Sequence, residues 1–241
     1  MRWRPLILAA ILCLFSFNAA SQATASNLDS SISTSGDFVL GRQVTSTFDY
    51  EINDPYKPVD TALVIDESGS MGGVMQDAKD GAKSYVDNTN TGQGDENAVV
   101  EFENSASTIQ SLTGSKNAAK DAIDTISDGG GTDLPAGVSE GANALDSGSN
   151  PQQVMIVLAD GGGGDPGTQA DNARDQGIEV HGIMYGSGAS TSEFESLTNS
   201  DCSTNSNENN DGDKCWYAES GTIDQVYNSI RESTEIETDA S

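Results

Sequence analysis

The chain has 241 residues, a length typical of one domain of ordinary size or of one domain with a small extension. Asp and Glu total 38 whereas Lys and Arg total 11, so the formal net charge is -27 at pH 7, which excludes a basic nucleic-acid-binding protein because phosphate neutralisation needs clustered cations. The single histidine, His181, excludes a zinc site with several histidine ligands and leaves only one base for a histidine-dependent catalytic triad.

Residues 1–25 are typical of a secretory signal peptide. Arg2 and Arg4 give a positive start, residues 5–17 are almost entirely apolar, and Ala23-Thr24-Ala25 provides a cleavage site flanked by small residues. The apolar run is shorter than the roughly 20 residues of a membrane span, and a short buried helix is the alternative interpretation. No second apolar stretch of spanning length follows. We therefore expect a mature chain without a transmembrane segment, secreted or on the extracellular cell surface.

Residues 26–58 follow a different pattern. Apolar and polar residues alternate between Val44 and Ile52, which predicts a half-buried strand. Pro55 and Pro58 then mark the entry to the next part of the chain. We expect a small N-terminal β extension here, followed by a main domain at residues 59–241.

In the main domain, predicted strands alternate with predicted helices. The expected strands are residues 60–65, 98–102, 107–112, 154–159, 178–185 and 216–218. The expected helices are residues 71–86, 116–126, 134–145, 168–176, 192–198 and 223–236. This order predicts an α/β fold, a Rossmann-like doubly wound and mostly parallel sheet with helices on both faces, in which residues 107–112 form an antiparallel edge. In such folds ligands bind beyond the carboxyl ends of the strands.

Three loops at that edge of the predicted sheet carry oxygen-bearing side chains and glycines. They are residues 66–71 after the first strand, 129–133 before a helix, and 160–162 after the most apolar strand. Oxygen ligands suit Mg²⁺, Mn²⁺ or Ca²⁺ rather than zinc. The candidate metal ligands are two acids and three hydroxyl residues: Asp66, Asp160, Ser68, Ser70 and Thr132. If the carboxylates stand behind the hydroxyls, the ion stays under-neutralised and attracts a carboxylate from a partner.

At these positions the chain resembles a von Willebrand factor type A (VWA) domain, and the resemblance covers roughly residues 59–236. The five candidate ligands match, in order, all positions of that family's metal-ion-dependent adhesion site (MIDAS). The resemblance implies direct coordination by Ser68 and Ser70, coordination by Thr132 directly or through water, and largely water-mediated roles for Asp66 and Asp160. It also implies that a Glu or Asp of a bound protein completes the coordination.

Other interpretations of these residues remain open. Ser68 and Ser70 are also good N-caps for a following helix. The glycine-rich residues 161–167 suggest a phosphate-binding loop, but the Gly-Lys-Ser/Thr ending is missing. His181 lies in the middle of a predicted strand, and we expect a structural role for it.

The cysteines also suggest export. Cys13 lies in the predicted signal peptide, which leaves Cys202 and Cys215 as an even pair that we expect to form a disulfide in an oxidising compartment. The loop between them, at residues 207–212, resembles the start of a calcium-binding loop but has Ala218 where the last acidic ligand belongs.

The expected function is binding of a protein partner through a divalent-metal adhesion site, without catalysis. A self-assembling structural subunit of an extracellular layer or appendage is one alternative, and a metal-dependent hydrolase is another. Acidic residues are scattered along the whole chain, which is typical of a salt-adapted surface. An ordinary acidic secreted protein is the alternative to salt adaptation.

Overall fold

A computed structural model describes residues 56–186, 188–202 and 215–239, with side chains up to residue 234. The strands are β1 (Val59–Asp66), β2 (Glu96–Phe102), β3 (Ala106–Thr113), β4 (Gln152–Ala159), β5 (Ile178–Tyr185) and β6 (Cys215–Ala218). The α-helices are α2 (Met75–Asn88), α3 (Lys116–Thr125), α4 (Leu134–Leu145), α5 (Gly167–Asp175), α6 (Thr191–Thr198) and α7 (Ile223–Asp239). The predicted signal peptide, and the predicted β extension up to residue 55, lie outside the described residues.

The six strands form one sheet in the order β3-β2-β1-β4-β5-β6. All neighbouring pairs are parallel except β2 and β3, which are antiparallel, so the predicted fold and its antiparallel edge are confirmed. The central strand β1 is buried along its whole length, with Leu63 opposite Val99 of β2 and Ile156 of β4. Strands buried on both faces explain the continuous apolar runs in the sequence.

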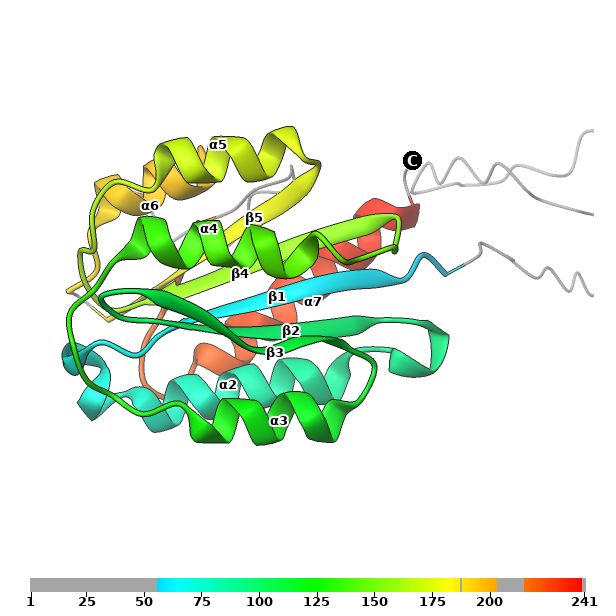
Figure 1. The fold of residues 1–241 in the computed structure, drawn as a ribbon, viewed down its shortest axis with the longest axis horizontal. Coiled ribbons are helices and arrows are strands. Elements are labelled where there is room, and N and C mark those ends of the chain that lie inside the picture. Colours follow the sequence, from blue (N-terminus) through cyan, green and yellow to red (C-terminus); the bar gives the residue numbers. More distant parts are fainter. Residues whose placement is uncertain (1–55, 187, 203–214, 240–241) are drawn as a thin grey trace, which may run out of the picture. The chain divides into compact units, whose positions relative to one another are not determined.

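Helices cover both faces of the sheet (Figure 1). On one face, α2, α3 and α7 pack over a core that includes Leu63 and Ile65 of β1. On the other face, α4, α5 and α6 pack over a core that includes Ala62 and Val64. Alternate residues of β1 therefore enter opposite cores, as the two-residue period of a strand requires.

The first predicted helix begins later than the sequence pattern indicates. A short 3-10 helix at Gly69–Gly73 precedes α2, which begins at Met75 rather than residue 71. Adjacent glycines disfavour an α-helix, and a Cβ added at Gly72 would lie 2.7 Å from the Asp128 carboxylate. The backbone therefore makes a tight turn here before the α-helix starts. None of the described helices is both long and apolar enough to span a membrane.

Candidate metal site

The loop that follows β1 is joined by backbone hydrogen bonds to the loop that precedes α4. The Gly129 N–H donates to the Glu67 carbonyl at 2.7 Å, and the Gly69 N–H donates to the Gly130 carbonyl at 3.3 Å. Gly130 has a φ of 69°, in the left-handed region that favours glycine. These contacts hold two of the three predicted site loops side by side.

The loop that follows β4 lies against both of them. A Cβ added at Gly163 would lie 2.7 Å from the Thr132 methyl carbon, and one added at Gly161 would lie 3.8 Å from the Ser70 hydroxyl oxygen. The Leu134 N–H donates to the Gly163 carbonyl at 3.0 Å. The three loops therefore converge at the carboxyl end of the sheet, as predicted.

Hydrogen bonds connect four of the five predicted ligands. The Ser68 N–H donates to Oδ1 of Asp66 at 2.8 Å, and the hydroxyl oxygens of Ser68 and Ser70 lie 3.0 Å apart. The Ser70 hydroxyl donates to Oδ1 of Asp160 at 2.7 Å. Asp66 and Ser68 are buried, whereas Ser70 is exposed, so this chain of side chains leads from the core to the surface.

Thr132 joins the site through its loop. It is partly buried, with its methyl group against Gly163. Among the described residues, no hydrogen bond connects its hydroxyl to the other four predicted ligands. A complete adhesion site is therefore not shown by these contacts.

The carboxylate of Asp66 is unusual because it is buried and only partly satisfied. Its Oδ2 has no hydrogen-bond partner among the described residues. Burial raises the pKa of Asp66, hydrogen bonds from Ser68 lower it, and the charge of Asp160 raises it further. A buried anionic oxygen without a donor is what a nearby cation or its bound water would stabilise.

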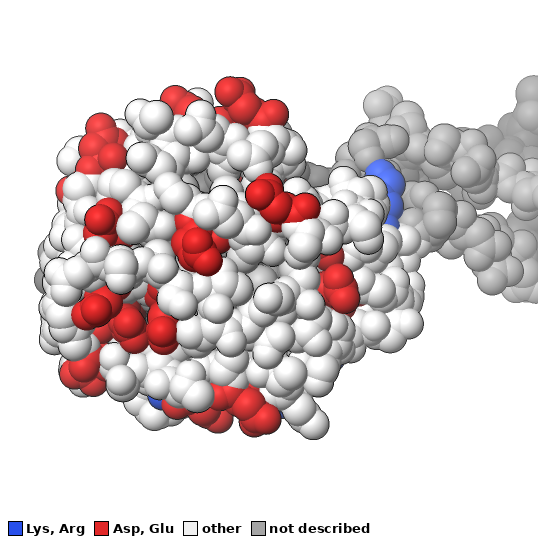
Figure 2. Space-filling view, viewed as in Figure 1, with Lys and Arg blue, Asp and Glu red and all other residues white. Residues whose placement is uncertain are grey.

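Glu67 lies within the loop after β1, and Glu101 and Glu103 lie close to it. Burial, followed by the charges of Glu101 and Glu103, raises the pKa of Glu67 to about 7. Within the described residues these three glutamates form no salt bridge. Figure 2 shows acidic side chains across one face of the molecule, with a group toward the end at which β1 runs into its loop. The surroundings of the site are therefore strongly negative.

Carboxylates alone do not make a metal site here. The described part of the chain holds no group of three or more His, Cys, Asp or Glu side chains placed to bind a metal ion. Asp66 and Asp160 supply two carboxylates, so a cation at this position would also need the hydroxyl oxygens of Ser68, Ser70 or Thr132. That donor set fits Mg²⁺, Mn²⁺ or Ca²⁺.

The capping interpretation of the two serines is wrong. Ser68 precedes the 3-10 helix but makes no capping hydrogen bond with its side chain, and the residue that precedes α2 is Val74. Ser70 lies inside the 3-10 helix and bonds to Asp160 instead. Neither hydroxyl therefore caps a helix, and the two lie next to each other and to Asp160.

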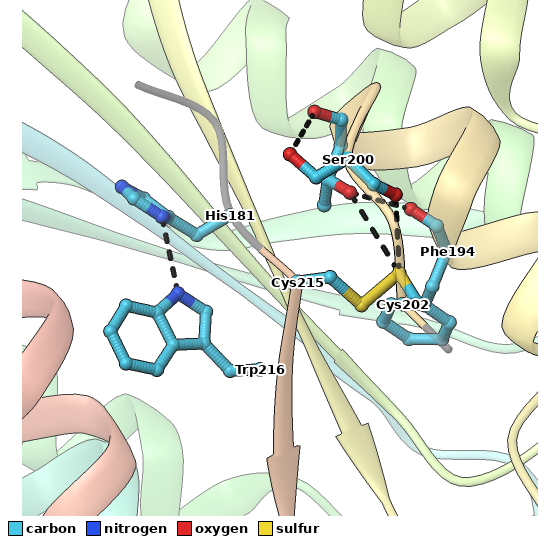
Figure 3. Close-up of a disulfide and its surroundings, with 7 residues drawn as sticks. His181, Phe194, Ser200, Cys202, Cys215 and Trp216 are labelled. Carbon is cyan, nitrogen blue, oxygen red and sulfur yellow. Dashed lines mark hydrogen bonds between the residues drawn. A yellow bond between two sulfur atoms is a disulfide. The ribbon is translucent and has the colours of Figure 1, made fainter. Parts of the chain in front are cut away.

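Figure 3 shows His181 of β5 and the disulfide between Cys215 of β6 and Cys202, which follows α6. His181 is fully buried, accepts a hydrogen bond from Trp216 at 3.4 Å on Nδ1, and has Nε2 2.7 Å from Glu179. This burial supports the structural role that we expected. Cys202 and Cys215 form a disulfide with Cα atoms 5.5 Å apart, and the calcium-loop-like residues 207–212 lie outside the described residues.

Sequence comparison matches residues 60–215 to the model of the von Willebrand factor type A domain. Among curated proteins, no significant match is found. The vWF domain of the type V pili tip protein Mfa5 from Porphyromonas gingivalis is similar in structure, with a TM-score of 0.65, 12% identity, and coverage of 77% of this chain and 97% of that chain.

Two further structures are similar over a smaller part of their length. Proximal thread matrix protein 1 from the mussel byssus, with a zinc-occupied MIDAS motif, has a TM-score of 0.61 and 23% identity over 76% of this chain and 46% of that chain. A von Willebrand factor type A protein from Catenulispora acidiphila has a TM-score of 0.58 and 19% identity over 74% of this chain and 43% of that chain. At these identities the structural matches show the shared fold.

Proposed function

Because the chain belongs to the von Willebrand factor type A domain family, we propose that it is a secreted or cell-surface protein that binds a protein partner through a divalent-metal adhesion site. The proposed ligands are the five predicted residues: Asp66, Ser68, Ser70, Thr132 and Asp160. The observation that carries the proposal is the row of hydrogen bonds from Ser68 through Ser70 to Asp160. It lies beside Oδ2 of Asp66, which has no hydrogen-bond partner in the part of the chain that the structure describes.

The contacts suggest how this donor set would work. Asp66 and Asp160 each have one oxygen engaged, by the Ser68 N–H and by the Ser70 hydroxyl respectively. Asp160 therefore holds the Ser70 hydroxyl and Asp66 holds the Ser68 backbone, which leaves lone pairs of both serine hydroxyls to offer to a cation. An ion held mainly by neutral oxygens keeps much of its charge, which favours a carboxylate from the partner at an open coordination position.

A structural role in an extracellular assembly is the second candidate. It is supported by the names of two similar structures, a pili tip protein and a thread matrix protein, and by the predicted signal peptide. In both candidates the site binds rather than catalyses, and the metal remains one of Mg²⁺, Mn²⁺ or Ca²⁺.

Isothermal titration of each metal ion, together with thermal unfolding, tests the proposal. Wild-type protein should show saturable heat, and metal at about 100 times its Kd should add about 2.7 kcal/mol of stability. Asp66→Ala should lose both effects. Asp121→Ala, on the exposed side of α3, is the matched control and should keep them. A wild-type protein without metal-linked heat or stabilisation would contradict the proposal.

The partner can then be sought directly. Binding of proteins from the native cell envelope should require metal and should be lost with chelator or with Asp66→Ala. Size-exclusion chromatography at high salt, with and without metal, separates the two candidates, because a structural subunit should associate with itself.

A further inference from the structure

Glu193 lies in the first turn of α6 and reaches across to the glycine-rich loop after β4. Its carboxylate accepts hydrogen bonds from the Gly163 N–H at 2.9 Å and from the Gly164 N–H at 3.2 Å. We infer that Glu193 is a positioning residue for the proposed metal site, acting through this loop on Thr132. The inference rests on the proposed function and adds a residue outside the five expected ligands.

Gly163 is the link between Glu193 and the site. Its N–H is held by Glu193, and its carbonyl accepts from the Leu134 N–H at 3.0 Å. Its Cα faces the Thr132 methyl group so closely that an added Cβ would lie 2.7 Å away. A shift of Gly163 therefore moves the surface against which Thr132 packs, and with it the Thr132 hydroxyl.

The loop contains four consecutive glycines, residues 161–164, and therefore needs hydrogen bonds from outside the loop to keep one conformation. Glycine loses more backbone entropy on ordering than any other residue, and these residues have no side chains with which to hold a conformation. Gly164 has a φ of 94°, which few other residues adopt readily. Two hydrogen bonds to an ionised carboxylate are stronger than bonds between neutral groups and can fix this backbone.

The two ends of the loop are held by different elements. At the Asp160 end, the Ser70 hydroxyl bonds to the carboxylate. At the far end, Glu193 holds Gly163 and Gly164 from α6. Glu193 lies in the first turn of α6, a position that acidic side chains favour, and each of its two carboxylate oxygens accepts one amide hydrogen.

A simpler account is that Glu193 only adds negative charge near a cation. Two variants distinguish this account from positioning. Glu193→Asp keeps the charge but is one methylene shorter, so it cannot make both bonds. Glu193→Gln keeps the length but places an NH₂ donor against one of the two amide N–H groups. Glu195→Gln, on the same helix, is the matched control for loss of charge.

The test combines Mn²⁺ titration with hydrogen exchange of the metal-free protein. We expect Glu193→Asp and Glu193→Gln each to weaken Mn²⁺ binding by about tenfold, as substitutions behind metal ligands do. Both should speed exchange at residues 160–164 in metal-free protein, while the secondary structure by circular dichroism is unchanged. Glu195→Gln should match the wild type in both measurements.

Each other outcome has a defined meaning. Wild-type affinity in Glu193→Asp with a loss in Glu193→Gln would overturn positioning in favour of simple charge. Unchanged exchange at residues 160–164 would overturn the inference as well. If the wild type binds no Mn²⁺, the proposed metal site itself is contradicted. Faster exchange in the variants would then show that Glu193 stabilises the loop without any role in metal binding.

Discussion

The disulfide allows a quantitative prediction for the part of the fold that follows α6. Cys202 and Cys215 are 13 residues apart, and they join the segment that follows α6 to the start of β6. In the chain-entropy model, a crosslink that closes a loop of this size stabilises the folded state by about 3 kcal/mol. For a domain of this size, about 3 kcal/mol corresponds to a fall in Tm of about 6–12 °C when the crosslink is removed.

Thermal unfolding of oxidised protein, reduced protein and Cys202→Ala/Cys215→Ala, all at one salt concentration, measures this effect. The reduced protein separates the crosslink from packing, since it keeps both sulfur atoms, and Cys202 is only 5% exposed. The double variant should unfold at the temperature of the reduced protein or slightly below it. A difference of less than about 2 °C between oxidised and reduced protein would refute the entropic reasoning.

Two further predictions concern the site. Gly163→Ala should destabilise the protein by about 1–3 kcal/mol and weaken metal binding, because the new Cβ would overlap the Thr132 methyl group. Gly129→Ala is the control, because a Cβ added there meets no atom within 4 Å. It should leave both urea denaturation and metal titration nearly unchanged. Glu67 has a folded-state pKa of about 7, above its usual 4.5. Between these pH values the metal-free folded protein keeps a proton that the unfolded chain releases. The free energy of unfolding should therefore fall as pH rises from about 4.5 to 7. Urea denaturation of Glu67→Gln across this range should show a smaller fall, and an identical slope in the variant would contradict the assigned pKa.

Most of the fold was predictable because local signals agreed with the tertiary structure. The helix α4 begins and ends where it was predicted, since Pro135 lies in its first turn and the Asp133 side chain caps it by accepting from the Ala136 N–H at 3.0 Å. The error at residue 71 arose because the apolar spacing of α2 continues back to Met71, which is fully buried but belongs to the 3-10 turn. The spacing of apolar residues alone does not distinguish the first turn of an α-helix from a 3-10 helix that precedes it.

Four of the proposed ligands, Asp66, Ser68, Ser70 and Asp160, were predictable from their positions after β1 and β4, since parallel strands bring their carboxyl ends to one edge of the sheet. Thr132 instead lies in the loop before α4. Glu193 was not predictable, because it contacts a loop that lies 30 residues earlier in the chain. In the sequence it is an ordinary acid in a short amphipathic helix. The sequence indicates its role only indirectly. A run of four glycines beside a predicted site suggests that a side chain from another element fixes the loop backbone.

The glycine loop also bears on how a partner would be recognised. A phosphate-binding loop works by offering free backbone N–H groups to an anion, but here the Gly163 and Gly164 N–H groups are already bonded to Glu193. This loop therefore gives a partner's carboxylate no attraction from these two amides, and the negative charges of Glu101 and Glu103, which already raise the pKa of Glu67, would repel it. A bound cation would reverse that repulsion. Chelation should therefore abolish binding of an acidic partner rather than weaken it, and residual binding in chelator would show that the partner contacts the chain elsewhere.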